Sequence, residues 1–245
     1  MVIPPPNPLD TVALDRSLCG LGQAQSVHER LAILRQLAEY WHGPIGPGEG
    51  FTDDELKGKP APFPLRWWHQ LAGRRENILG GQNKLLKPNQ LKLDEQGRVP
   101  FYVENQGVYL WSAALQSDDP RVWGRFEEAG RPWSEEGMRL SEFLIGACLF
   151  ESIMQSPFGA TAAWADESTL EQIAVELTPL PLAPWRWPSD PSRFFARNGG
   201  FMFASPNANR QTIKCYSIWV GAKTARPLAF LNQIVNQETW EHIAL

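Results

Sequence analysis

The chain has 245 residues, of which 43 % are hydrophobic and 20 % charged, with a formal net charge of −4. This is the composition of an ordinary globular protein that can bury a full core, and the weak negative charge argues against a nucleic-acid binder, which usually has a basic face. The three cysteines are far apart and form no C-x-x-C pair. We therefore expect neither a disulfide framework nor a zinc site, and favour a reducing compartment.

Residues 1–25 are rich in proline, glycine and polar residues, so we expect an extended N-terminal arm there, followed by a single domain over residues 26–245. The first ten residues contain four prolines and lack the basic and apolar regions of a secretory signal. No apolar run approaches the ~18 residues that a membrane span needs. These features indicate a soluble, cytoplasmic protein without a membrane partner.

Two helices are predicted in the first third of the domain. Ser26 and Glu29 have the spacing of a capping box, and apolar residues recur every three or four positions over residues 27–41, ending before Gly43. A second helix is predicted over residues 64–72, with proline at its favoured first position.

A β-hairpin is predicted in the middle of the chain. Apolar and other residues alternate over residues 99–103, which is the period-two pattern of a strand. Glu104 to Gly107 has the composition of a hairpin turn, with glycine where a positive φ is needed, and residues 108–111 return as the partner strand. We expect this hairpin to form the centre of a sheet, with residues 121–137 lying over it.

The most apolar segment, Leu140 to Met154, predicts a largely buried helix. The Pro/Trp segment 179–191 either docks onto the core or binds a partner, and docking is the commoner arrangement. Strands are predicted near residues 200–204 and 212–220, and a final amphipathic helix from Arg226. Together the elements predict a single α+β domain with a central, mostly antiparallel sheet flanked by helices.

No established catalytic motif is present: the sequence lacks G-x-G-x-x-G, Walker A, H-E-x-x-H and G-x-S-x-G patterns. The four histidines have no metal-ligand spacing; they are His28, His42, His69 and His242. We therefore expect a non-enzymatic protein without metal or cofactor. A small hydrolase that pairs Glu104 with Asp118 or Asp119 is a weaker alternative, since it needs two convergent carboxyl groups with different pKa values.

Five segments in order resemble the SMI1/KNR4 (SUKH) superfamily, over about Pro60 to Glu151. They are Phe63–Trp68 leading to Gly73, Asn83–Leu86 with Pro88, Phe101–Tyr102 and Glu104–Gly107 followed by Trp111, Asp118–Trp123, and Leu140–Leu144 continuing to Phe150–Glu151.

The resemblance implies an α+β fold and a role in protein binding. Many bacterial members of the superfamily are immunity proteins that bind and neutralise a cognate toxin, and others are adaptor-like or regulatory modules, which is the main alternative here. The family has no catalytic residues to carry over. The candidate partner-interface residues are the polar groups of the matched turns: Glu104, Asn105, Gln106, Asp118 and Asp119. The acidic balance of the chain would suit a basic nuclease toxin.

Overall fold

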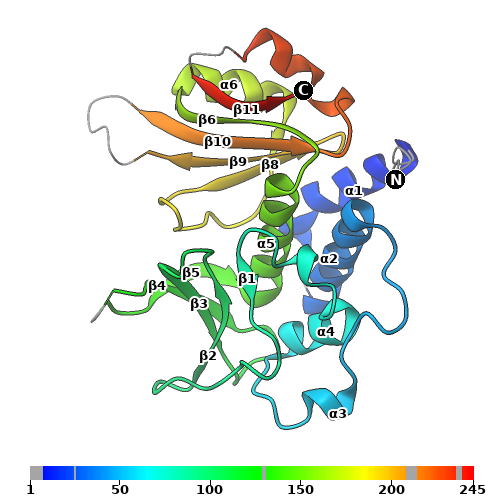
Figure 1. Cartoon of the computed structure of the whole chain (residues 1–245), viewed down its shortest axis with the longest axis vertical. Helices are drawn as coiled ribbons and strands as arrows, with labels where there is room; N and C mark the ends of the chain where they lie inside the picture. Colours follow the sequence, from blue (N-terminus) through cyan, green and yellow to red (C-terminus); the bar gives the residue numbers. More distant parts are fainter. Residues whose placement is uncertain (1–7, 25, 129–130, 208–213, 236–238) are drawn as a thin grey trace. The chain divides into compact units, whose positions relative to one another are not determined.

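The computed structural model describes residues 8–24, 26–128, 131–207, 214–235 and 239–245 (Figure 1). It confirms the α+β class and the antiparallel pairing of strands. The strands form two sheets where one central sheet was predicted, a five-stranded and a six-stranded one. The chain also divides into two compact units: one is Ala24–Glu151, and the other combines the N-terminal segment up to Gln23 with Ser152–Leu245. The predicted domain of residues 26–245 therefore spans nearly all of one unit and most of the other.

The unit Ala24–Glu151 contains the five-stranded sheet, in which neighbouring strands follow the chain order. Its helical elements are α2 (Val27–His42), α3 (Asp53–Leu56), α4 (Phe63–Ala72), the 3₁₀ helix η2 (Glu76–Ile78) and α5 (Leu140–Met154), the last three residues of which fall in the other unit. Its strands are β1 (Lys84–Leu85), β2 (Arg98–Val103), β3 (Tyr109–Ala114), β4 (Arg121–Phe126) and β5 (Ser134–Arg139).

Helix α5 covers one face of this sheet through aromatic packing. The ring of Phe143 lies 5.3 Å from that of Phe101 and 5.5 Å from those of Tyr102 and Trp111, all three on the central strands. These four side chains are fully buried, and aromatic pairs at such distances add to the stability gained by burial alone. The predicted hairpin of residues 99–111 is thus confirmed as β2 and β3, and the apolar segment from Leu140 as a buried helix.

Residues 121–137 were expected to lie over the sheet, and this was wrong, because they provide its strands β4 and β5. Charged and aromatic residues occupy the outward positions of β4, which alternate with buried Val122 and Gly124. Gly124 is required by a close approach: a Cβ there would meet the Tyr109 hydroxyl at 2.4 Å. That hydroxyl crosses above Gly124 to donate a hydrogen bond of 2.8 Å to the buried Glu136 carboxylate.

The second unit is built on the six-stranded sheet, ordered β11-β6-β10-β9-β8-β7. Its strands are β6 (Phe158–Asp166), β7 (Thr178–Pro179), β8 (Arg193–Arg197), β9 (Gly200–Pro206), β10 (Cys215–Ala222) and β11 (Trp240–Ala244). Its helical elements are α1 (Pro8–Cys19), α6 (Glu167–Glu176) and the 3₁₀ helices η1 (Leu21–Gln23) and η3 (Arg226–Gln233).

The expectation of an extended arm over residues 1–25 was wrong for the described residues from Pro8 to Cys19, which form α1. Pro8 stands in the first turn of the helix, where its lack of an N–H costs nothing. Leu14 and Leu18 are fully buried, and the Asp15 carboxylate accepts a hydrogen bond of 2.5 Å from the Asn198 N–H in the β8–β9 turn. The N-terminal segment is therefore an integral part of the second unit.

Three further outcomes concern the C-terminal half. The strand predicted at residues 212–220 is confirmed as β10, which runs from Cys215 to Ala222, while Thr212 and Ile213 lie outside the described residues. The helix predicted from Arg226 is a 3₁₀ helix, with Leu228 and Leu231 buried as its amphipathic pattern requires. In the Pro/Trp segment 179–191, Trp185 is buried and stacks edge-on against Phe194 at 5.4 Å, which is docking onto the core.

Candidate functional site

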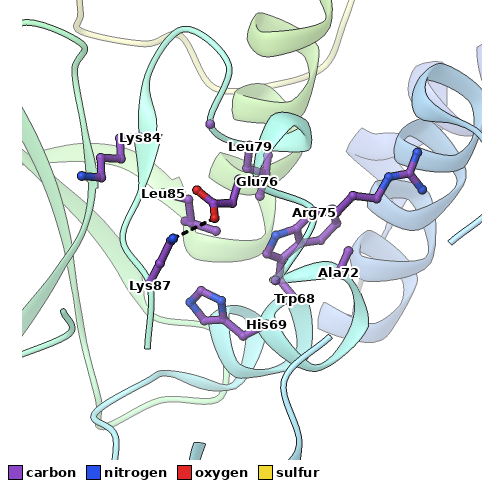
Figure 2. A pocket seen from close by; sticks show the side chains of 11 residues that line it. Trp68, His69, Ala72, Arg75, Glu76, Leu79, Lys84, Leu85 and Lys87 are labelled. Atoms are coloured by element: carbon purple, nitrogen blue, oxygen red, sulfur yellow. Dashed lines mark ion pairs between the residues drawn. The ribbon is translucent and has the colours of Figure 1, made fainter. Parts of the chain in front are cut away.

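A small cavity of about 40 Å³ lies beside His69 in the unit Ala24–Glu151 (Figure 2). Helix α4 presents His69 and Trp68 to it, and the segment after η2 contributes Lys84 and Lys87. The His69 side chain is buried, and among the described residues its ring nitrogens have no well-aligned hydrogen-bond partner, although the Leu86 backbone lies near one of them. Burial lowers the pKa of His69 to about 4, although a nearby backbone group of Leu86 favours the charged form.

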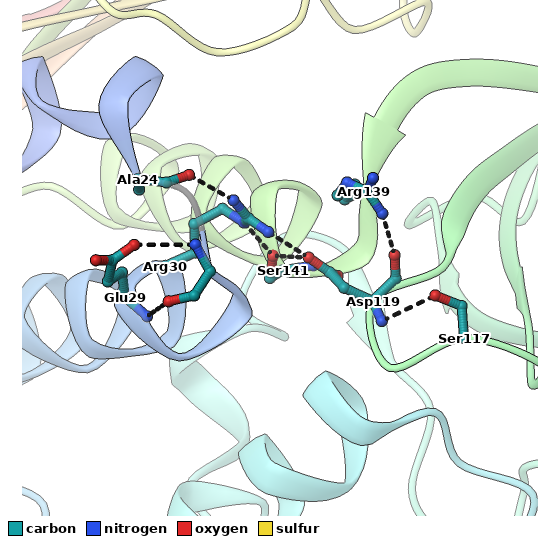
Figure 3. A network of polar contacts seen from close by, with 8 residues as sticks. Ala24, Glu29, Arg30, Ser117, Asp119, Arg139 and Ser141 are labelled. Atoms are coloured by element: carbon teal, nitrogen blue, oxygen red, sulfur yellow. Dashed lines mark hydrogen bonds and ion pairs between the residues drawn. The ribbon is translucent and has the colours of Figure 1, made fainter.

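Asp119 is a structural residue that joins α2 to α5 (Figure 3). One carboxylate oxygen accepts from the Ser141 N–H at 2.9 Å, and the other accepts from the Ser141 hydroxyl at 2.6 Å and from Arg30 at 2.8 Å. Arg30 in turn donates to the Ser141 hydroxyl and to the Ala24 carbonyl, both at 2.7 Å. Asp119 thereby satisfies one free N–H group in the first turn of α5, that of Ser141, whereas neighbouring Asp118 is exposed.

Glu104 is likewise committed to the backbone of its own turn. Its carboxylate accepts from the N–H groups of Gln106 at 2.9 Å and Val108 at 3.3 Å, and the side chain is buried. Gly107 adopts the positive φ of 75° that the turn needs. Among the predicted interface residues of this turn, Asn105 and Gln106 are exposed.

The two sets of predicted interface residues lie at opposite ends of strand β3. The turn at Glu104 precedes Tyr109, and the turn at Asp118–Asp119 follows Ala114. Five steps of a strand cover about 16 Å, whereas paired catalytic carboxyl groups in hydrolases stand roughly 5–10 Å apart. Glu104 therefore does not form an acid–base pair with Asp118 or Asp119.

Glu151 is a buried carboxylate whose role was not predicted from the sequence. It links three of the segments that resemble the SMI1/KNR4 superfamily. It accepts from the Asn83 N–H and the Tyr102 hydroxyl, at 2.8 and 2.7 Å, and from the Gln82 N–H at 2.5 Å. Asn83 then accepts from the Asn105 N–H at 3.2 Å. Burial raises the pKa of Glu151, and the three hydrogen bonds oppose that rise. Glu151, Asn83 and Tyr102 are buried, so these three residues maintain the fold and are inaccessible to a partner.

The outward face of the five-stranded sheet carries a stack of arginine and tryptophan side chains, here called the Trp–Arg face: Arg98, Trp123, Arg125 and Trp133. The Arg98 guanidinium lies 5.1 Å from the centre of the Trp123 ring and 5.2 Å from that of Trp133, and Arg125 lies 4.6 Å from Trp133. Such cation–π contacts fix the orientation of long side chains. The Arg98 side chain is only 12 % exposed, while both tryptophans are half-buried.

Sequence reasoning also missed the Trp–Arg face, although one signal was available. Trp123 and Arg125 alternate with buried residues in β4, which is the pattern of a strand with one outward face. Arg98 and Trp133 come close only because strands β2 to β5 pair with one another. No pattern in the nearby sequence predicts that contact.

The described part of the chain contains no group of three His, Cys, Asp or Glu side chains placed to hold a metal ion. Within the same residues, no helix has the length and apolar character to cross a membrane. Comparisons with protein-family models, with curated proteins and with solved structures found no match.

Proposed function

We propose that this chain is a protein-binding protein of the SMI1/KNR4 type, an immunity protein that neutralises a cognate bacterial toxin by covering it. The observation that carries the protein-binding part is the Trp–Arg face. Tryptophan and arginine are among the residues most enriched at the energetic centres of protein interfaces, and here the arginine side chains already stack on the tryptophan rings. Side chains ordered before binding lose less entropy when a partner docks.

The resemblance supports the immunity part. Its matched residues have the structural roles expected of a shared scaffold: Glu104 closes a turn, Asp119 caps α5, and Asn83 binds Glu151 and Asn105. A scaffold held by buried residues leaves the exposed surface free to vary with the partner. We accordingly place the interface on the Trp–Arg face, and retain exposed Asn105, Gln106 and Asp118 as candidates at its ends.

The test is co-expression with the protein encoded by the neighbouring gene. If that protein is toxic, we expect this chain to restore growth and to bind it directly. Trp133→Ala should weaken binding by about 30-fold, the effect of losing a hot-spot residue worth about 2 kcal/mol. Trp164→Ala is the matched control, because Trp164 is 45 % exposed and belongs to the other unit.

Two results would contradict the proposal. A neighbour that is not toxic, or a toxic one whose effect this chain leaves unchanged, removes the immunity role, and capture of housekeeping proteins would then favour the adaptor alternative. Binding that is lost in Trp164→Ala and kept in Trp133→Ala moves the interface away from the Trp–Arg face.

A further inference from the structure

A second pocket, of about 150 Å³, lies in the unit that contains the six-stranded sheet. Strands β6, β10 and β11, which are neighbours in that sheet, line it together with the end of α5 (Figure 1). Among the described residues of the lining, none is a lysine, arginine, aspartate or glutamate, and His242 is the one titratable group. A charged ligand would lose hydration here without gaining an ion pair, so the pocket favours an uncharged one.

Four side chains of the lining can form hydrogen bonds with a ligand. Within the described part of the chain, no group is hydrogen-bonded to the Thr161 hydroxyl, the Trp219 indole N–H or the His242 imidazole. The Ser156 hydroxyl donates to the Ile153 carbonyl at 2.7 Å and keeps its lone pairs for accepting. The pocket therefore offers both donors and acceptors, which suits a ligand with several hydroxyl groups.

A backbone irregularity brings His242 into the pocket lining. Strand β11 pairs with β6 at Glu241 and again at Ala244, opposite residues that are only two apart on β6. This extra residue is a β-bulge, and His242 adopts a positive φ of 52° within it. In a regular strand His242 would lie on the side of Trp240, which packs into the core, whereas here it lines the pocket. Bulges often re-aim a side chain in this way beside functional sites.

The volume of the pocket matches a single sugar ring. A water-sized group needs roughly 10–15 Å³ of such volume, so 150 Å³ admits roughly ten to fifteen of them. A hexopyranose has twelve non-hydrogen atoms, of which six are oxygens. Its ring also has a face of C–H groups, and these can contact the electron-rich face of an indole such as that of Trp219.

We propose that this pocket binds one ring of a neutral sugar, with the C–H face of the ring against Trp219. The hydroxyl groups of the sugar bond to Thr161, His242 and Ser156. A purely aromatic ligand of the same size would leave these polar groups unpaired, which costs free energy. Sugar binding is independent of the toxin-binding role, because all these residues belong to the unit that does not carry the Trp–Arg face.

The test is an NMR titration of the tryptophan indole N–H signals of the full chain with glucose, galactose and N-acetylglucosamine. The Trp219 signal is identified by its absence in Trp219→Phe. We expect it to shift saturably with at least one of the three sugars, with a dissociation constant of roughly 1 mM, as is usual for a ligand of this size. The Trp164 indole, which is 45 % exposed on β6 and outside the pocket lining, is the internal control and should not respond.

Two matched compounds separate the ring from its hydroxyl groups. Sorbitol has the same twelve non-hydrogen atoms as glucose and no ring, and benzyl alcohol has a ring and a single hydroxyl group. Each should bind at least tenfold more weakly than the best of the three sugars. The absence of a saturable Trp219 response to all three sugars, or equal binding of sorbitol, would overturn the proposal.

Side-chain variants test the hydrogen bonds. Thr161→Val keeps the shape of the side chain and should weaken sugar binding about fivefold, the effect of losing one neutral hydrogen bond. His242→Gly removes the imidazole while tolerating the positive φ, and should weaken binding by a similar factor. Thr178→Val is the matched control, because Thr178 is exposed on β7 and outside the pocket lining. Unchanged affinity in both Thr161→Val and His242→Gly would contradict the proposed site.

A last arm identifies the source of the sugar. Maltotriose, lactose and chitotriose end in glucose, galactose and N-acetylglucosamine, and are titrated in the same way. Tighter binding of the longer sugar than of its own terminal ring supports a glycan chain as the ligand. Equal or weaker binding supports a free monosaccharide.

Discussion

At the scale of single residues, the most consequential group is the buried carboxylate of Glu151. It is fully buried and accepts hydrogen bonds from two backbone N–H groups and from Tyr102. Removing acceptors from buried donors costs more than the bonds themselves contribute, because the donors cannot turn to water. A single substitution there is thus expected to loosen the segment at Asn83 and the hairpin strand β2 together.

Glu151→Gln is predicted to lower the free energy of unfolding by about 2–3 kcal/mol, because an amide offers one acceptor oxygen and turns an NH₂ group toward backbone donors. Tyr102→Phe removes only one bond and should cost about 1 kcal/mol. Urea unfolding of both variants at neutral pH measures the difference. Equal stability of Glu151→Gln and the wild type would mean that the carboxylate contributes no net stabilisation.

At the scale of elements, Asp119 shows how one side chain positions a helix. Its carboxylate binds Ser141 in the first turn of α5 and forms an ion pair with Arg30 of α2. The two charged side chains are 13 % and 7 % exposed, so water screens the pair little. Its neighbour Asp118 has the same chemistry and is exposed, which makes the two aspartates a natural matched pair.

Asp119→Ala is predicted to lower the free energy of unfolding by about 2–4 kcal/mol. The substitution removes the helix cap and leaves the mostly buried Arg30 charge without its partner. Asp118→Ala should change stability by less than about 0.5 kcal/mol, as exposed substitutions usually do. Thermal unfolding followed by circular dichroism compares them. Similar losses in both variants would show that the turn, and not the buried carboxylate, sets the stability.

For the whole molecule, the change of stability with pH has contributions of opposite sign from buried histidine and from buried carboxyl groups. His69 has a pKa of about 4 in the folded protein, against about 6.5 when unfolded. The unfolded chain therefore binds the proton first, and stability falls as pH drops from 6.5 toward 4. Burial raises the pKa of Glu151 and Asp15, so their contributions change in the opposite direction, with stability decreasing as pH rises through their titration.

The wild type should lose up to about 3 kcal/mol to His69 between pH 7 and pH 4, from a difference of about 2.5 pKa units at 1.36 kcal/mol each. In His69→Gln this part of the pH dependence should vanish, leaving a flatter profile. Urea midpoints measured every half pH unit provide the comparison. Parallel profiles for the two proteins would show that His69 does not titrate differently on folding.

Local signals account for what the sequence predicted correctly in the fold. The capping box at Ser26 and Glu29 is present, and so are the hairpin at Glu104–Gly107 and the buried helix from Leu140. The errors concern non-local pairing. Charged strand β5 reads as surface because only one of its faces is buried, and α1 becomes stable only through strands more than 170 residues away.

The candidate sites follow the same division. The turn residues Glu104 and Asp119 were recognisable as polar groups in turns. The Glu104 carboxylate bonds within its own turn, whereas Asp119 is buried by its bonds to α2 and α5. Neither the stacking of Arg98 between Trp123 and Trp133 nor the isolation of His69 has a sequence pattern, since each results from several strands or helices meeting. The spacing of residues along the chain thus identified two carboxylates with structural roles. It did not identify the Trp–Arg face or the cavity beside His69.

The joining of the N-terminal segment with Ser152–Leu245 in one unit has a consequence for biosynthesis. On the ribosome, α1 emerges before strands β8 and β9, so Leu14 and Leu18 stay exposed until these strands follow. The unit Ala24–Glu151 is continuous and can fold during this interval, as domains usually do when their chain is complete. Helix α1 can therefore pack into its unit only after the strands of Ser152–Leu245 are made, and its apolar face is open to aggregation or to chaperones during that interval.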